Sequence, residues 1–374
     1  MMARWLSPDR LDWMWKPGQE LSLPGALLRL PLSLLAGAYG GLMQARAAAY
    51  QKGWLPSRRL PAKVAAVGNL TVGGSGKTPL ARWLAARLSA EGRRVALISR
   101  GYRRASAAPV TVASRGDGPL GSARELGDEP YWLAQNLAGV PVLCGPDRVR
   151  VGEQAIAQFR ATHLVLDDGF QHLRLERDAD VVVVDGRRSP AGEALLPRGR
   201  LREPWSALHR AAVVVVNKVS RPDPAWTEWL SRWNPEAPVF FSRYQPVGIF
   251  SLAGEPAEDQ GPALAFAGLA EPDYFFELLA AKVQVKDRVA FPDHHSYSAA
   301  ELKELAARAR AAGAERMITT EKDAGRLAGL GLPALPIHSL RVALDFFGRE
   351  DDCYAAIRSR LEEKGAGLKA PSRA

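Results

Sequence analysis

The feature that most constrains this chain is a glycine-rich loop between a short apolar run and a helical pattern. The apolar run "AKVAAVG" ends at Gly68, the loop "TVGGSGKTP" covers residues 71–79, and a helix-forming segment continues to Gly92. A strand, a glycine loop and a helix in this order form the phosphate-binding unit of open α/β sheets. The order therefore predicts a sheet whose first strand delivers a loop to an anionic ligand.

The loop departs from the usual phosphate-loop pattern at its first position, where Thr71 replaces glycine. Its glycines let backbone amides approach phosphate oxygens without side-chain obstruction. Lys77 is expected against the β- and γ-phosphates, and the Thr78 hydroxyl is expected on Mg²⁺. The residues expected to bind the nucleotide are Gly73, Gly74, Ser75, Gly76, Lys77 and Thr78.

Apolar runs of strand length follow the loop and alternate with helical patterns, as in "VALIS", "LVLDD", "DVVVVD" and "VVVVN". Parallel strands covered on both faces have this composition. We expect an α/β fold: a mostly parallel sheet like that of P-loop NTPases, with helices on both faces, and a smaller α/β lobe. The expected division is an N-terminal segment (1–60), a core (61–245), a second lobe (246–350), and a C-terminal helix with a frayed tail (351–374).

The N-terminal segment contains an uncharged run, residues 30–45, which is shorter than the ~20 residues that cross a bilayer. Aromatic and basic residues surround it, as they do at membrane interfaces. We expect a helix lying on a membrane; a buried helix packed on the core and a true span are the alternatives. The flanking residues are Trp5, Trp13, Trp15, Tyr39, Tyr50, Trp54, Arg29, Arg46, Lys52, Arg58 and Arg59.

Net charge and cysteine content indicate the kind of partner and the redox compartment of this chain. A formal net charge of +10 favours anionic partners such as phosphates, nucleic acid or an acidic membrane, although an arginine-rich composition alone can produce it. Two cysteines, Cys144 and Cys353, are too few for a disulfide framework and fit a reducing cytoplasm.

Carboxylates mark two further candidate sites. Asp167 and Asp168 end the run "LVLDD" at the carboxyl edge of the predicted sheet, where a carboxylate can hold Mg²⁺; an ordinary Asp-Gly turn is the alternative. "GDEP" places Asp128 and Glu129 before a proline. Phosphoryl transfer to a hydroxyl needs a proton acceptor, and a carboxylate oriented by a histidine suits that task.

The histidine candidates lie in "FPDHH", which contains His294 and His295. Taken alone, a histidine pair in a loop is more often solvated surface than catalytic, and a metal site would need further ligands.

The ordered set "GNLTVGGSGKTP", "ISRGYRR", "GDEP", "DDGFQH", "LREP", "FPDHH" and "TTEKDAGRL" resembles the tetraacyldisaccharide 4′-kinase family. The resemblance runs from the N-terminal apolar segment to about Asp345, and the loop with Thr71 is similar to that family's own version. It implies phosphoryl transfer from ATP, with Mg²⁺, to the 4′-hydroxyl of a tetraacyl glucosamine disaccharide 1-phosphate, giving lipid IVA in lipid A biosynthesis. It also implies a peripheral position on the cytoplasmic face of the bacterial inner membrane, with an anionic glycolipid and that membrane surface as partners and no nucleic acid.

The resemblance also implies roles for individual residues. Asp128 is implied as the catalytic base, His294 as its partner with His295 as the alternative, and Lys77 as a catalytic cation. The implied Mg²⁺ set is Thr78, Glu129, Asp167 and Asp168. The residues implied near the phosphates or the substrate are His172 and Arg202, with Arg198, Arg200, Ser99 and Arg100 as less specific neighbours.

Two other classes stay open from the residues alone. A P-loop GTPase or metallochaperone-like nucleotide hydrolase would share the loop and the strand-ending Asp, and "VVVVNKVS" is similar to a guanine-reading motif except that Ser220 stands where Asp is needed. A membrane-attached nucleotide sensor would bind ATP without acting on a lipid.

Overall fold

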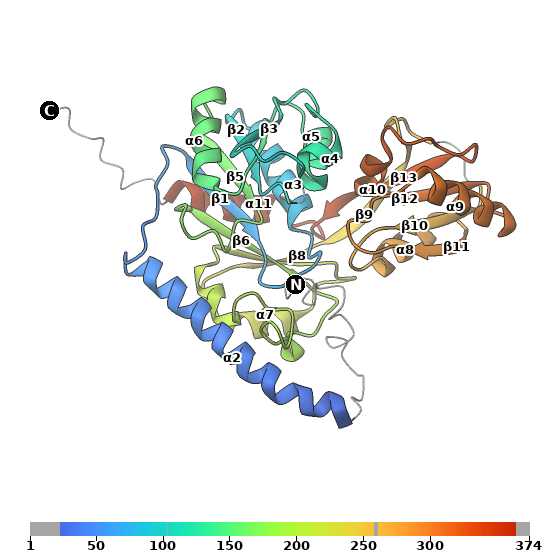
Figure 1. Cartoon of the computed structure of the whole chain (residues 1–374). Coiled ribbons are helices and arrows are strands. Elements are labelled where there is room, and N and C mark those ends of the chain that lie inside the picture. The colour runs from blue at the N-terminus through green and yellow to red at the C-terminus, as the bar shows by residue number, and fades with distance from the viewer. Residues whose placement is uncertain (1–22, 103, 258–260, 364–374) are drawn as a thin grey trace.

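The computed structural model describes residues 23–102, 104–257 and 261–363, which form two lobes and an N-terminal helix (Figure 1). The larger lobe, the core, contains an eight-stranded sheet in the order β3-β4-β2-β5-β1-β6-β7-β8. All neighbours are parallel except β3 and β4. The strands are β1 (Lys63–Gly68), β2 (Val95–Ser99), β3 (Thr111–Ser114), β4 (Val142–Cys144), β5 (His163–Asp167), β6 (Ala179–Asp185), β7 (Val213–Asn217) and β8 (Val239–Phe241).

Helices cover both faces of this sheet, because alternate strand residues are apolar on each side. In β6, Val181 and Val183 belong to the apolar cluster under α3 and α5, whereas Val182 and Val184 belong to the cluster on the opposite face. The core helices are α3 (Lys77–Ala90), α4 (Ala123–Leu126), α5 (Asp128–Asn136), α6 (Arg148–Phe159), α7 (Pro224–Ser231), α11 (Glu350–Glu363), and the 3₁₀ turns η2 (Pro190–Gly192) and η3 (Trp205–Arg210). The expected α/β class with a mostly parallel sheet is confirmed.

The second lobe has its own five-stranded sheet, in the order β11-β10-β12-β13-β9. Only β9 runs antiparallel to its neighbour. Its elements are β9 (Arg243–Ser251), β10 (Ala263–Ala267), α8 (Asp273–Ala280), β11 (Val285–Ala290), α9 (Ala299–Ala311), β12 (Arg316–Thr320), α10 (Glu321–Leu327) and β13 (Ile337–Asp345).

Both connections between the lobes run side by side. Arg243 pairs with Asp345 at the ends of β9 and β13, and the Arg243 Nε donates to Asp345 Oδ2 at 2.8 Å. After β13 the chain returns to the core, where Cys353 and Ile357 of α11 are buried in the same apolar cluster as Trp83 of α3. The second lobe is therefore inserted into the core between β8 and α11 (Figure 1).

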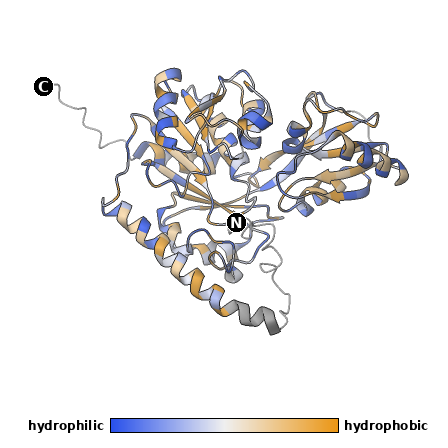
Figure 2. Ribbon diagram, viewed as in Figure 1, coloured by the Kyte–Doolittle hydropathy of each residue, from blue (hydrophilic) through white to orange (hydrophobic). Residues whose placement is uncertain are grey.

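The helix α2 (Leu23–Gln51) lies along the outside of the core (Figure 1). Leu30 and Leu34 are each 70% exposed and Leu42 is 63% exposed, so the helix is not buried in the core. Apolar residues occupy much of its described length (Figure 2). No helix among the described residues has the length and apolarity to span a membrane. Trp5, Trp13 and Trp15 lie outside the described residues.

The inner side of α2 touches loops of the core. Tyr39 Oη donates to the backbone carbonyl of Arg202 at 2.9 Å, and the Arg46 guanidinium donates to the carbonyl of Gln171 at 3.3 Å. Gly40 faces the Leu195 side chain so closely that any larger residue would collide with it. The helix therefore has an apolar exposed side and a polar side that binds two core loops.

Candidate active site

A cavity of about 410 Å³ lies between the two lobes, at the carboxyl ends of the central core strands. The core contributes the glycine loop, and the second lobe contributes residues that follow β10 and β12 together with His294. The sequence-predicted residues that line this cavity are Gly73, Gly74, Gly76, Lys77, Thr78, Glu129, Asp168, Arg202 and His294.

The glycine loop enters α3 through two glycines with left-handed backbone. Gly73 has a φ of 105°, and Gly76, at the N-cap of α3, has a φ of 97°. Because Lys77 and Thr78 are the first residues of α3, they lie where the amides and the dipole of the helix favour an anion. Thr71 instead forms an antiparallel bridge with Leu201, an extended pairing that a β-branched residue suits.

Thr78 and Asp167 form a buried pair beside the loop. The Thr78 hydroxyl donates to Asp167 Oδ2 at 3.0 Å, and both residues are almost fully buried. Burial and the nearby Glu129 carboxylate raise the pKa of Asp167 to about 7. Asp167 Oδ1 is buried and has no hydrogen-bond partner among the residues that the structure describes. A desolvated, unpartnered carboxylate oxygen beside a hydroxyl fits a divalent cation.

No group of three or more His, Cys, Asp or Glu side chains in the described ranges is arranged to hold a metal alone.

Asp168 binds the Arg202 guanidinium rather than pointing freely into the cavity. Arg202 donates to both carboxylate oxygens, at 2.9 and 3.3 Å, and to the carbonyl of Asn69 at 3.1 Å. Burial alone would raise the pKa of Asp168, but Lys77 and Arg202 hold that pKa below its usual value. Asp168 thus remains ionised and fixes an arginine at the rim of the loop.

The Asp128 carboxylate receives two partners from the second lobe. His294 Nδ1 lies 2.7 Å from Asp128 Oδ2, and Arg326 Nη2 lies 2.9 Å from the same oxygen. Burial would raise the pKa of Asp128, but the hydrogen bond from His294 and the charge of Arg326 hold that pKa below its usual value. Asp323 accepts from Arg326 Nη1 at 2.6 Å and so orients the guanidinium.

The two neighbouring histidines have different surroundings. His294 has a φ of 59°, donates its backbone amide to the carbonyl of Gly268 at 3.3 Å, and directs its ring to Asp128. His295 stacks on Phe291 with ring centroids 4.6 Å apart, and its Nε2 lies 3.0 Å from Glu301 Oε1. Since Glu301 belongs to the capping box of α9, His295 supports the start of a helix.

Glu129 also forms an ion pair across the lobe boundary: Lys322 Nζ lies 3.5 Å from Glu129 Oε1. Burial would raise the pKa of Glu129, but Lys322 and Lys77 hold it below its usual value. An ionised carboxylate therefore lies near Lys77.

Other sequence-predicted residues lie behind the cavity wall. The Ser75 hydroxyl accepts from Asn69 Nδ2 at 2.9 Å, which makes it a support of the loop. Burial, with the charge of Arg148, lowers the pKa of His172 to about 4, and its Nε2 is buried without a hydrogen-bond partner in the described part of the chain. Arg198 is exposed and Ser99 is buried, whereas Arg100 lines the cavity.

Several cavity residues were not identified from the sequence. Arg326 and Lys322 lie in "TTEKDAGRL", a motif of the family resemblance that implies no role for either residue. Lys218 lies in "VVVVNKVS", the segment similar to a guanine-reading motif. Asn217 of that same motif donates to the carbonyl of Ser75 at 3.0 Å, so its amide supports the loop. No sequence pattern identifies Glu271, Tyr244 or Tyr274 as a cavity residue.

Known proteins share both sequence and fold with this chain. The family model described as tetraacyldisaccharide-1-P 4′-kinase matches residues 27–362. A tetraacyldisaccharide 4′-kinase of Anaeromyxobacter sp. (strain K) is 44% identical over 89% of each chain. One from Anaeromyxobacter sp. (strain Fw109-5) is 46% identical over 94% of this chain and 96% of its own. A crystal structure of LpxK from Aquifex aeolicus in complex with ATP matches with a TM-score of 0.70, at 28% identity, over 89% of this chain and 99% of the other.

Proposed function

Because the chain belongs to the tetraacyldisaccharide 4′-kinase family, it is an ATP-dependent kinase of lipid A biosynthesis, and we propose specific roles for the residues of its interlobe cavity. The observation that carries this proposal is that His294, which contacts Asp128 at 2.7 Å, lines the same cavity as the glycine loop. One side of the cavity suits nucleotide phosphates, and the other suits the hydroxyl that is phosphorylated.

We assign the donor side to the start of α3. Lys77 neutralises charge on the transferring phosphoryl group, and the loop amides hold the adjacent phosphates. Thr78 and Asp167 are the residues that would hold Mg²⁺, with Glu129 nearby. When bound, Mg²⁺ supplies charge neutralisation at the phosphate oxygens.

On the acceptor side, Asp128 is the proton acceptor for the sugar hydroxyl. A carboxylate with a lowered pKa is a weak base, which suffices because the loose transition state of phosphoryl transfer needs little early proton removal. His294 orients Asp128, and Arg326 keeps it ionised. His172, behind the loop, and Arg202, at its rim, are assigned to the donor side, near the nucleotide phosphates.

The substrate is a glycolipid, and we propose that the protein meets it on the cytoplasmic face of the inner membrane as a peripheral protein. The exposed leucines of α2 support this, since such a helix binds a bilayer by burying its apolar side among lipid headgroups. The net charge of +10 adds attraction to anionic lipids.

The direct test of the function is phosphate transfer from MgATP to a tetraacyldisaccharide 1-phosphate, with the position of the new phosphate determined by NMR. Phosphate at the 4′-position is the expected result. ATP hydrolysis without lipid phosphorylation, or GTP preferred over ATP, would instead support the nucleotide-hydrolase alternative, which the family membership does not favour.

The membrane proposal has its own test. Replacing Leu30, Leu34 and Leu42 with serine should release the protein from anionic vesicles, because each apolar side chain contributes about 1.5–3 kcal/mol when buried. Replacing the less exposed Leu55 serves as the matched control. Unchanged binding of the triple variant in a flotation assay would place attachment elsewhere.

A further inference from the structure

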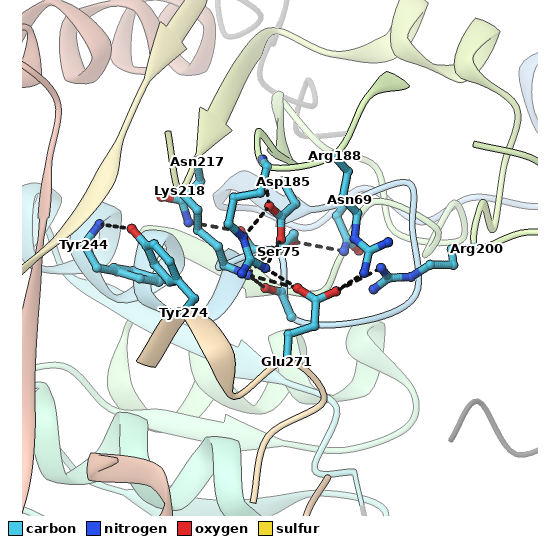
Figure 3. A network of polar contacts seen from close by, with 12 residues as sticks. Asn69, Ser75, Asp185, Arg188, Arg200, Asn217, Lys218, Tyr244, Glu271 and Tyr274 are labelled. Carbon is cyan, nitrogen blue, oxygen red and sulfur yellow. Dashed lines mark hydrogen bonds and ion pairs between the residues drawn. The ribbon is translucent and has the colours of Figure 1, made fainter. Parts of the chain in front are cut away.

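Three side chains of the core hold the backbone of the glycine loop, and Figure 3 shows them around Ser75 of that loop. Each donates to a loop carbonyl. The pairs are Arg200 with Val72 at 2.9 Å, Asn217 with Ser75 at 3.0 Å, and Lys218 with Gly74. A carbonyl that is bound on the outside of a loop keeps the neighbouring amides directed to the inside, where an anion would bind. The shape of the loop therefore depends on these three donors.

The fit between donors and loop leaves no room for other residues. A Cβ added at Gly73 would collide with the Arg200 guanidinium, and one added at Gly76 would collide with the Asn217 amide. Both glycines also have positive φ, which side chains disfavour. A displacement of Arg200 or Lys218 would accordingly be transmitted to the loop directly.

Two of these donors pair with one carboxylate of the second lobe. Glu271, in the turn between β10 and α8, lies 2.9 Å from Arg200 Nη1 and 3.9 Å from Lys218 Nζ (Figure 3). The side chains of Arg200 and Lys218 are only 8% and 7% exposed. Lys218 also pairs with Asp185 of β6, at 2.8 Å, so Glu271 is a close partner of Arg200 and a second, more distant partner of Lys218. Buried cations are costly unless they are paired, so the position of Glu271 affects where both can lie, and Arg200 most.

Other cations around Glu271 do not touch the loop in this way. Arg187 pairs with Glu271 and with Asp185 of β6, and Arg188 pairs with Glu271 while its side chain stays 31% exposed. Neither donates to a loop carbonyl in the hydrogen bonds of the described residues. Arg188 therefore offers a control that weakens the same ion-pair group without altering the donors behind the loop.

We propose that Glu271 is a positioning residue for phosphoryl transfer: the second lobe sets the shape of the phosphate loop by holding Arg200 and Lys218 on their carbonyls. The inference rests on the proposed role of the loop as the ATP phosphate site. The docking of the second lobe then has two effects: it shapes the phosphate loop, and it brings His294 to Asp128.

The test is Glu271→Gln in the full-length protein, measured with MgATP and lipid both saturating. This change keeps the size of the side chain and removes its charge. The kcat should fall about tenfold, because small misplacements of a reacting group are costly in rate. The dissociation constant for ATP, measured by equilibrium binding, should change less than threefold, since Arg200 and Lys218 stay positively charged beside the nucleotide. Arg188→Gln should keep kcat within about twofold of wild type.

Two further variants separate positioning from stability. Glu271→Asp retains the charge and should recover part of the lost kcat. The double variant of Glu271→Gln with Lys218→Met should be hardly slower than Lys218→Met alone, because residues that act as a unit are non-additive. Thermal unfolding of each variant reports whether it is folded.

Four results would overturn the proposal: a wild-type kcat for folded Glu271→Gln, an equal loss in Arg188→Gln, multiplicative losses in the double variant, or a failure of Glu271→Asp to exceed Glu271→Gln. Failure of the proposed function gives a different pattern, because wild type itself would then transfer no phosphate to the lipid.

Discussion

The phosphate loop lines the cavity directly and Asp128 reaches it through His294 and Arg326, and the partners of the two groups come from different parts of the chain. Thr78 binds Asp167 and Arg202 binds Asp168, all within the core. Asp128 binds His294 and Arg326, both supplied by the second lobe. The direct contacts of the donor side therefore lie within the core, and the second lobe reaches the loop indirectly, through Glu271 and Arg200, whereas the acceptor side is completed only where the lobes meet.

This difference allows ATP binding and phosphoryl transfer to depend on different parts of the protein. Water competes with the sugar hydroxyl for a phosphoryl group, so a kinase benefits when its proton acceptor is completed only as the cavity closes. Because the loop amides and Lys77 belong to the core, they can bind ATP before that event, and the docking of Glu271 then adjusts the shape of the loop for transfer. Changes in the core should thus affect the donor side first, and changes across the lobe boundary should affect the chemical step.

The largest expected effect is at Asp128. Asp128→Ala should lower kcat by about 10²–10⁴-fold while leaving the dissociation constant for ATP nearly unchanged, because a proton acceptor acts on the hydroxyl. Steady-state kinetics and equilibrium nucleotide binding check both parts. A defect confined to ATP binding would assign Asp128 to the donor side and would break the comparison.

Lys77→Ala should reduce kcat by about 10²–10³-fold, through loss of a preorganised charge at the transferring group. Unlike Asp128→Ala, this variant should also weaken ATP binding, since Lys77 lies at the phosphate end of the site. Lys322→Ala, on the other lobe, is the comparison variant for binding. Near wild-type turnover in folded Lys77→Ala would refute the phosphate-loop assignment.

A smaller loss is expected at His294. If this ring only orients Asp128, His294→Ala should lower kcat about tenfold, and the double variant with Asp128→Ala should be no worse than Asp128→Ala alone. His295→Ala is the matched control, because that ring contacts Glu301 instead. A greater loss for His295→Ala would show that the neighbouring ring is the functional one.

The smallest effect concerns stability and tests whether the core loops are formed without ligand. His172 has a folded pKa of about 4, lowered by burial, against an unperturbed value near 6.5. Between these values the unfolded chain binds a proton that the folded chain does not, so this residue makes stability rise with pH from about 4 to 6.5. His172→Gln should show a shallower rise of Tm across that interval in calorimetry. Equal slopes would mean that His172 is solvated in the free protein.

Much of the donor side was predictable, because each of its parts lies in a local strand–loop–helix or strand–turn pattern. The loop and Thr78 follow β1 and begin α3, Asp167 ends β5, and the parallel sheet brings the ends of these strands together. The resemblance to a family suggested the Asp128–His294 pair, but not its completion by Arg326. That contact joins helices of different lobes, and no local pattern encodes such a distance.

Other features depend on tertiary packing alone. The choice between His294 and His295 follows from a positive φ at one and an aromatic stack on Phe291 at the other, neither of which the residue types reveal. Asn217 fits a base-reading motif in sequence, yet its amide is used by Ser75 and Ser242. The return of α11 to the core was also unexpected, because its apolar residues fit any amphipathic helix.

That return has a consequence for how the protein is made. Translation delivers β1 through β8 first, then the whole inserted lobe, and only afterwards the helix that covers Trp83 and its neighbours. Because translation proceeds at about 5–20 residues per second, the apolar face of the core stays exposed for on the order of 5–20 s before α11 is synthesised. Premature termination within the second lobe would leave that face permanently bare, so such truncated chains should require chaperones and be degraded.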